Sequence, residues 1–206
     1  MGKKFLLMLV LALALPMAAF ADSSIGFTST GGTLNGSSFG MSLVGSTLVS
    51  ISDLSGTYTG ADLGNLTFTT GLMAAPGNVI DGAHFLVGGT VTITGNGSVP
   101  GAPSGVLFSG TFSQSPTWTR QTGTYLYTFS GLATGQLADG TSAEVLIQFT
   151  VDTVTRVFIT PISLSKVNVN ATAVQVPEPS SLALMGTGLI GLLGVVRRKY
   201  RKQSIA

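Results

Sequence analysis

His84 is the only histidine in the chain, so any Ser–His–acid triad would have to use it as the general base. The chain contains no cysteine nucleophile, and its Gly-x-Ser-x-Gly match at residues 36–40 is not followed by the helical pattern that the α/β-hydrolase turn requires. A single imidazole at the start of a strand, hydrogen-bonded or solvated, fully accounts for His84. We therefore assign no catalytic residue and expect that the protein is not an enzyme.

Carboxylates offer a second kind of catalysis, because glycosidases use two of them as acid and base or nucleophile. The sequence supplies Asp139 with Glu144 and Asp53 with Asp62 as candidate pairs. A domain with seven acidic residues contains such pairs by chance, and a turn already explains Asp139 in its Asp-Gly step. A glycosidase-type enzyme is the least favoured of the functions considered.

Metal binding finds no support in the sequence. The absence of cysteine excludes cysteine-based zinc and iron–sulfur sites. Neither an Asp-x-Asp-x-Asp-Gly calcium loop nor a Gly-Gly-x-Gly-x-Asp repeat occurs. We expect no metal and no other cofactor.

Three aromatic residues are the best candidates for ligand binding. Tyr125 and Tyr127 alternate onto one strand face, and with Trp118 they would offer flat rings on which sugars stack. Packing of the same rings in the core is the competing interpretation. Exposure of the rings would favour a carbohydrate-binding module for the cell's own exopolysaccharide, and burial of all three would exclude it.

Threonine alternates along two short segments, at Thr67 and Thr69 and again at Thr90, Thr92 and Thr94. Regular rows of threonines on a flat sheet are similar to the surfaces with which ice-binding proteins order water. Two short rows do not establish such a surface. They do predict a solvated sheet face with little charge.

Charge is distributed very unevenly along the chain. Seven of the ten basic residues flank the two apolar ends. Between residues 22 and 177, three bases and seven acids leave a net charge of −4. This part of the chain has no positive stripe to neutralise a phosphate backbone, so we expect no nucleic-acid partner.

Residues 1–21 have the three parts of a secretory signal peptide. Lys3 and Lys4 precede the apolar run 5–15, and Ala19 and Ala21 form a small-residue cleavage pattern. The run is shorter than the ~20 residues that a membrane-spanning helix needs. We expect export by the secretion machinery and cleavage after Ala21.

A second apolar segment, residues 181–196, lies near the other end of the chain and carries no charge. It is short for a ~30 Å hydrocarbon core, but long flanking basic side chains reach the interface and close most of the gap. The basic residues that follow are Arg197, Arg198, Lys199, Arg201 and Lys202. The positive-inside rule keeps this cluster in the cytoplasm, so we expect a transmembrane helix in the inner membrane with the preceding domain outside.

The residues just before this segment are Val176, Pro177, Glu178 and Pro179. The two prolines favour an extended backbone, which suits a protease cleft. In their order, the motif 176–180, the helix 181–196 and the basic cluster 197–202 resemble the sorting signal of PEP-CTERM proteins. The same module is also named after the C-terminal domain of ice-binding proteins. Residues 203–206 form a short tail.

The resemblance implies a definite route for the chain. An exosortase, which is an integral-membrane cysteine protease, would recognise Pro177, Glu178 and Pro179 and cut in or near them. The family further implies a Gram-negative-type envelope, a link with exopolysaccharide, and delivery to the cell surface or extracellular matrix after transient anchoring. These expectations favour a structural or adhesive role, in which the motif residues are substrate features.

Between the two ends, apolar residues alternate with a period of two, which is typical of half-buried strands. The clearest run is 85–94, where Val91 and Ile93 share one face. Turn dipeptides Asn35-Gly36, Asp81-Gly82, Asn96-Gly97 and Asp139-Gly140 separate the runs. The other predicted strands are 24–30, 46–51, 66–70, 106–113, 124–131, 143–152 and 156–173.

This pattern predicts an all-β exported domain over residues 22–174, followed by the sorting signal at 175–202, with residues 172–175 as a linker. An antiparallel β-sandwich of the jelly-roll kind is the leading prediction, and a barrel is the main alternative. A β-solenoid is disfavoured because no fixed repeat of 20 or more residues is visible.

Overall fold

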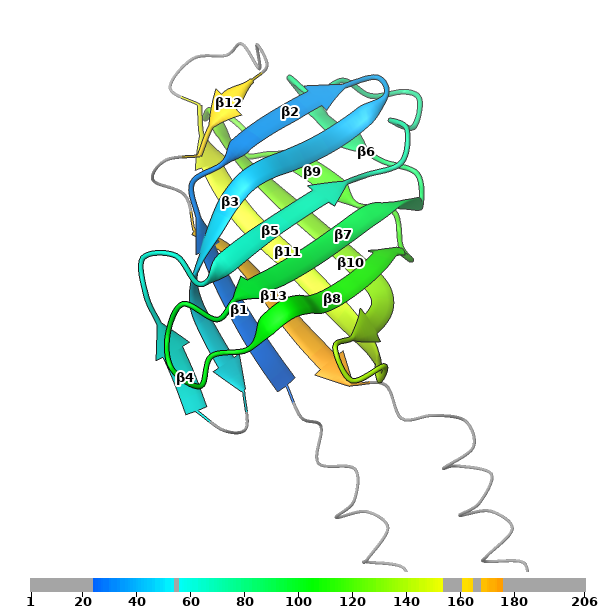
Figure 1. Cartoon of the computed structure of the whole chain (residues 1–206). Coiled ribbons are helices and arrows are strands. Elements are labelled where there is room, and N and C mark those ends of the chain that lie inside the picture. The colour runs from blue at the N-terminus through cyan, green and yellow to red at the C-terminus, as the bar shows by residue number, and fades with distance from the viewer. Residues whose placement is uncertain (1–23, 54–55, 154–160, 165–167, 176–206) are drawn as a thin grey trace, which may run out of the picture. The chain divides into compact units, whose positions relative to one another are not determined.

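The computed structural model describes residues 24–53, 56–153, 161–164 and 168–175, which belong to one compact unit, Ser23–Val176. All regular elements among these residues are strands, so the all-β prediction is confirmed for this part of the chain (Figure 1). The strands are β1 (Ser24–Thr30), β2 (Thr33–Ser37), β3 (Gly40–Asp53), β4 (Gly56–Thr59), β5 (Gly64–Thr69), β6 (Gly82–His84), β7 (Gly88–Asn96), β8 (Ser104–Phe112), β9 (Thr117–Arg120), β10 (Leu126–Leu137), β11 (Ser142–Asp152), β12 (Ile162–Ser163) and β13 (Asn168–Gln175).

The strands pair antiparallel along a path that closes on itself. The path runs from β3 through β5, β7, β8, β10, β11 and β13 to β1, which pairs with β3 again. The sheet therefore closes into a barrel, the alternative to the predicted sandwich. Two walls still face each other across the core, with β3, β5, β7 and β8 in front and β10, β11, β13 and β1 behind (Figure 1).

The jelly-roll connectivity is wrong. A jelly roll requires Greek-key crossovers, whereas successive strands on this path are neighbours in the sheet. β1 is the exception to this order, because the first strand of the chain pairs with β13, the last strand, as well as with β3. Local hairpins therefore build most of the barrel, and one long-range pairing closes it.

The arm formed by β1 and β2 bends at a pair of glycines. Thr30 pairs with Thr47 and Thr33 with Val44, so the arm keeps one register on β3 across the bend. Gly32 has φ of 96°, and a Cβ there would lie 3.0 Å from the Val44 carbonyl oxygen. Glycine is required at this bend because both the backbone angle and the close approach disfavour a side chain.

Two predicted boundaries are corrected by the strand pairing. Asn35-Gly36 is not a turn but lies within β2, and the chain reverses between Ser37 and Gly40, which pair directly. The predicted linker 172–175 belongs to β13, where Gln175 pairs with Ala143 of β11. In both places the partner strand decides the conformation. The predicted strand residues 156–160 and 165–167 lie outside the described part of the chain.

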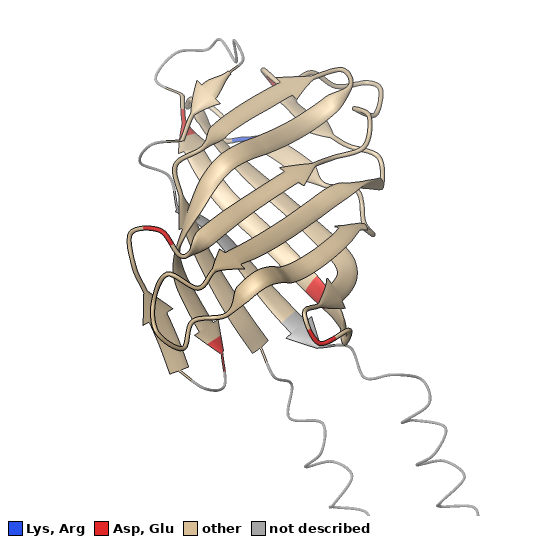
Figure 2. Ribbon diagram, in the orientation of Figure 1, with Lys and Arg blue, Asp and Glu red and all other residues tan. Residues whose placement is uncertain are grey.

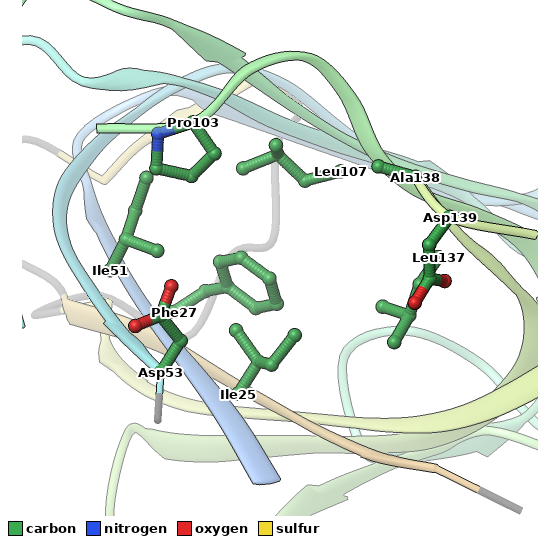
Figure 3. A pocket seen from close by; sticks show the side chains of 9 residues that line it. All are labelled: Ile25, Phe27, Ile51, Asp53, Pro103, Leu107, Leu137, Ala138 and Asp139. Carbon is green, nitrogen blue, oxygen red and sulfur yellow. The ribbon is translucent and has the colours of Figure 1, made fainter. Parts of the chain in front are cut away.

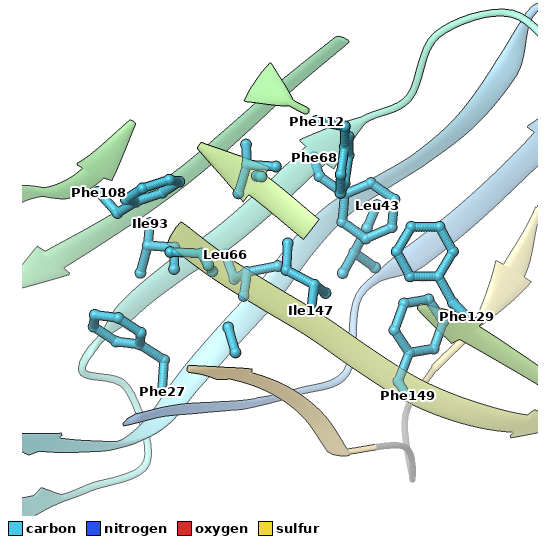
Figure 4. Close-up of a cluster of buried hydrophobic side chains, with 14 of the residues drawn as sticks. Phe27, Leu43, Leu66, Phe68, Ile93, Phe108, Phe112, Phe129, Ile147 and Phe149 are labelled. Carbon is cyan, nitrogen blue, oxygen red and sulfur yellow. The ribbon is translucent and has the colours of Figure 1, made fainter. Parts of the chain in front are cut away.

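Aromatic side chains fill the interior of the barrel. Phe68 stacks on Phe129 with ring centroids 4.8 Å apart, and Phe129 stacks on Phe149 at 5.1 Å. Phe112 meets Phe68 edge to face at 5.9 Å (Figure 4). These rings come from β5, β10, β11 and β8, so they tie the two walls together. A small closed barrel of this kind holds side chains rather than an internal ligand cavity.

The charged residues of the described part lie at strand ends and in connections, apart from Glu144 near the start of β11 (Figure 2). The barrel therefore contains a complete apolar core, and its first and last strands pair with each other. We expect residues 23–176 to fold without the flanking segments, because they form a compact unit by themselves.

Candidate functional site

The residues for which the sequence predicts a specific role in export or sorting lie outside the described part of the chain. They are the signal segment 1–21 with Ala19 and Ala21, the motif Val176, Pro177, Glu178 and Pro179, the helix 181–196, and the cluster Arg197, Arg198, Lys199, Arg201 and Lys202. In the part that the structure does describe, no helix is long and apolar enough to cross a membrane. The structure does show where the last described strand ends, since β13 remains paired up to Gln175.

The three aromatic residues do not form one exposed platform, and core packing holds for two of them. Trp118 and Tyr127 are 1% and 0% exposed and stack on each other inside the barrel, with centroids 5.0 Å apart. The loop before β6 covers them, because Trp118 Nε1 donates to the Val79 carbonyl oxygen at 3.0 Å and the Tyr127 hydroxyl donates to Ile80. Tyr125 alone is exposed, and the Arg120 guanidinium lies over its ring at 5.8 Å.

The two predicted carboxylate pairs are not brought together as acid and base. Asp62 accepts hydrogen bonds from Gly64 N and Asn96 Nδ2, and Asp53 accepts one from Gly56 N, so both organise loops. Glu144 lies on β11, where it pairs with Thr134. Asp53 and Asp62 therefore have local structural roles that the sequence pairing did not anticipate.

One cavity of about 200 Å³ does have two carboxylates in its lining, in a combination that the sequence did not suggest. Asp53 and Asp139 approach it from different sides, and the rest of the lining is apolar apart from the backbone (Figure 3). Thr141 N donates to Asp139 Oδ1 at 2.9 Å, and this bond lowers the pKa of Asp139. A glycosidase acid needs a raised pKa, so Asp139 is shifted in the opposite direction.

His84 ends β6 as an exposed residue whose backbone pairs with Thr117. The sequence placed His84 at the start of a strand, whereas it is the last residue of β6. Across the described ranges, no group of three or more His, Cys, Asp or Glu side chains is placed to hold a metal ion.

The two threonine rows lie side by side on the outer face of the front wall. Thr67 pairs with Thr92 and Thr69 with Thr90, and the last two hydroxyls are hydrogen-bonded at 3.0 Å. The polar rows continue on β8 and then onto the adjoining strand of the rear wall, β10, where Gln136 pairs with Ser109. We call this surface the hydroxyl face: Asn65, Thr67, Thr69, Thr90, Thr92, Thr94, Ser109, Thr111, Thr134 and Gln136.

None of these ten side chains is ionisable, and Glu144, which pairs with Thr134, is the carboxylate at the β11 edge of the hydroxyl face, so the chemistry of the face is mainly hydrogen bonding. Side chains repeat about every 6.7 Å along a strand and about every 4.8 Å between strands. Such a grid suits polyhydroxylated polymers or ordered water. The sequence contained both threonine rows, but only the register of β5 on β7 shows that they form one surface.

A family model matches residues 175–199, and its description is the PEP-CTERM protein-sorting motif. The chain carries a PEP-CTERM sorting motif. This match confirms the resemblance seen in the sequence, and it implies export, membrane-anchored transit and processing by an exosortase. The PEP-CTERM motif begins at Gln175, which is still paired in β13, so it follows the barrel without a spacer. No curated protein and no solved structure matches the chain.

Proposed function

We propose that this is a non-enzymatic surface or extracellular-matrix protein with a structural or adhesive role. A signal peptide exports it, the segment 181–196 holds it in the inner membrane, and an exosortase then releases or transfers it. The PEP-CTERM match at residues 175–199 carries this proposal. The direct junction of motif and β13 supports it, because cleavage there would free a barrel that keeps all its strands.

Changing Pro177, Glu178 and Pro179 together to alanine is expected to abolish processing. The alanines remove the two prolines and the carboxylate by which the exosortase is proposed to recognise the segment. Intact mass from the native host should show wild-type protein without residues 1–21 and without the helix 181–196, and a variant that keeps the helix. Ser180→Ala is the matched control and should be processed normally. If wild type and variant both retain the helix, the segment is a plain membrane anchor and the prediction of processing is contradicted.

The adhesive role has a proposed ligand, the exopolysaccharide of the cell, and a proposed surface, the hydroxyl face. The uncharged grid of hydroxyl and amide groups favours a neutral polysaccharide over a charged partner. This replaces the aromatic platform, whose rings Trp118 and Tyr127 are buried.

The pair Thr69→Val and Thr90→Val is expected to weaken binding to purified host exopolysaccharide about tenfold, since two exposed hydroxyls lose their hydrogen bonds. The control pair is Thr128→Val and Thr150→Val on the rear wall, whose hydroxyls are also exposed and lie 3.2 Å apart. Affinity electrophoresis measures both. Equal loss in the two double variants, or no binding by wild type, would contradict this surface.

A further inference from the structure

Three segments that are distant in sequence lie side by side at one end of the barrel. Met73 N donates to the Ser38 carbonyl oxygen at 3.1 Å, and Leu86 N donates to the Leu72 carbonyl oxygen at 2.8 Å. The turn of the β2–β3 hairpin therefore neighbours residues 70–73, which in turn neighbour residues 85–87. Figure 1 shows the hairpin, the end of β5 and the start of β7 at this same end.

Each of these segments exposes large apolar side chains. Phe39 in the hairpin turn is 81% exposed, Leu72 is 54%, Leu86 is 48% and Val87 is 58%. We call these four residues the apolar tip. Single exposed apolar residues are ordinary, but four on adjacent segments of one barrel end mark an interaction surface.

Several backbone groups at and beside the apolar tip are hydrogen-bonded within the protein. Phe39 N donates to Ser37 Oγ at 3.1 Å, and the Gly71 carbonyl oxygen accepts from Thr70 Oγ1 at 2.9 Å. The bonds between these segments satisfy further groups. Burying backbone groups without a partner is costly, so this internal bonding lets the tip enter an apolar medium cheaply.

The surroundings of the apolar tip carry very little charge. Its residues lie within the runs 24–52, 63–80 and 85–119, which contain no acidic or basic residue and no histidine. The ionisable residues nearest to the tip in sequence are Asp81, just before β6, and His84, the last residue of β6. An uncharged surface neither attracts a charged partner nor suffers ionic desolvation when it meets lipid.

A second copy of the chain is a poor occupant for this surface. Four side chains at these exposures offer on the order of 400 Å², about half of what each partner buries in a standard interface. A bilayer needs no such area, because a few apolar side chains with satisfied backbone dock in its interfacial region. We propose that the apolar tip docks on a bilayer of zwitterionic lipid.

This site is separate from the sorting motif. β3 leads from Gly40, beside Phe39, to Asp53 at its other end, where Ser52 pairs with Gly26 near the start of β1. Its 14 residues span about 45 Å. Gln175 ends β13 beside that start of β1, so the tip and the last residue of β13 lie at opposite ends of the barrel. The proposal therefore stands whatever the outcome of the processing experiment.

The test uses residues 23–176, which contain the complete core and lack the apolar terminal segments. Partition into phosphatidylcholine vesicles is measured by flotation. Val87→Asp places a charge in the tip and is expected to lower the partition coefficient at least tenfold. Val106→Asp is the matched control, because Val106 is 51% exposed on β8 outside the tip, and its partition should stay within about twofold of wild type.

Thermal melts of the two variants show whether each is folded. Adding anionic lipid should not strengthen wild-type binding, since the tip has no basic residue. The proposal is overturned if wild type does not float with the vesicles, or if both variants lose binding equally. It is also overturned if wild type forms a dimer that Val87→Asp abolishes while no vesicle binding is seen, because a second copy would then cover the tip.

Discussion

Gly135→Val is expected to lower the free energy of unfolding by about 3 kcal/mol or more, the largest effect predicted for a single glycine here. Gly135 of β10 pairs directly with Gly110 of β8. A Cβ at Gly135 would overlap the Ser109 carbonyl oxygen and would lie 2.5 Å from the Gly110 Cα. The two strands approach too closely for any side chain, so the seam between β8 and β10 would have to open.

The glycine pair also makes room for an aromatic ring. A Cβ at Gly110 would lie 2.7 Å from Cζ of Phe108, which shows that this ring covers the seam. Gly26→Ala is the matched control, since its nearest neighbour would be Ser52 Cβ at 3.8 Å and its φ is not positive. Denaturant unfolding should place Gly26→Ala within about 0.5 kcal/mol of wild type. A Gly135→Val barrel as stable as wild type would show that the seam adjusts.

Phe129→Ala is expected to cost about 3–5 kcal/mol, because it leaves a cavity at the centre of the aromatic cluster. The Phe129 ring is fully buried and stacks on both Phe68 and Phe149. These two neighbours belong to opposite walls and also meet each other, with ring centroids 6.2 Å apart, so the Phe129 ring completes a three-ring contact across the core. Calorimetry should show a correspondingly lower melting temperature.

Phe39→Ala is the control for this substitution. It removes the same atoms from a side chain that is 81% exposed. We expect a change within about 0.5 kcal/mol, since no packed interior is lost. Equal destabilisation by Phe39→Ala and Phe129→Ala would contradict the core assignment.

Local sequence patterns predicted the strands well, because alternation along one strand directly reflects which side faces the core. Val91 and Ile93 are buried and Thr90 is exposed, as their alternation indicated. Such local patterns could not predict that the barrel closes. It depends on the pairing of β1 with β13, in which Ser24 meets Val174 across almost the whole domain.

The two interpretations of the aromatic residues, core packing and a binding platform, could not be separated by sequence for a similar reason. Alternation cannot show what covers the inner face of a strand. Trp118 and Tyr127 are covered by the loop that contains Val79 and Ile80, and that loop is placed by tertiary contacts. The short strands β2, β4, β6 and β9 were missed because they depend on pairing with neighbouring strands rather than on their own periodicity.

The position of β13 has a mechanical consequence. β13 lies between β1 and β11 and leads at Gln175 directly into the sorting motif. Its hydrogen bonds run perpendicular to the strand, so tension along the strand between Gln175 and the apolar tip loads them together in shear instead of breaking them one by one. A barrel tethered through its C-terminal end and pulled from the tip would therefore resist rupture. Pulling Ser24 away from Gln175 would instead unzip the barrel from its closing seam.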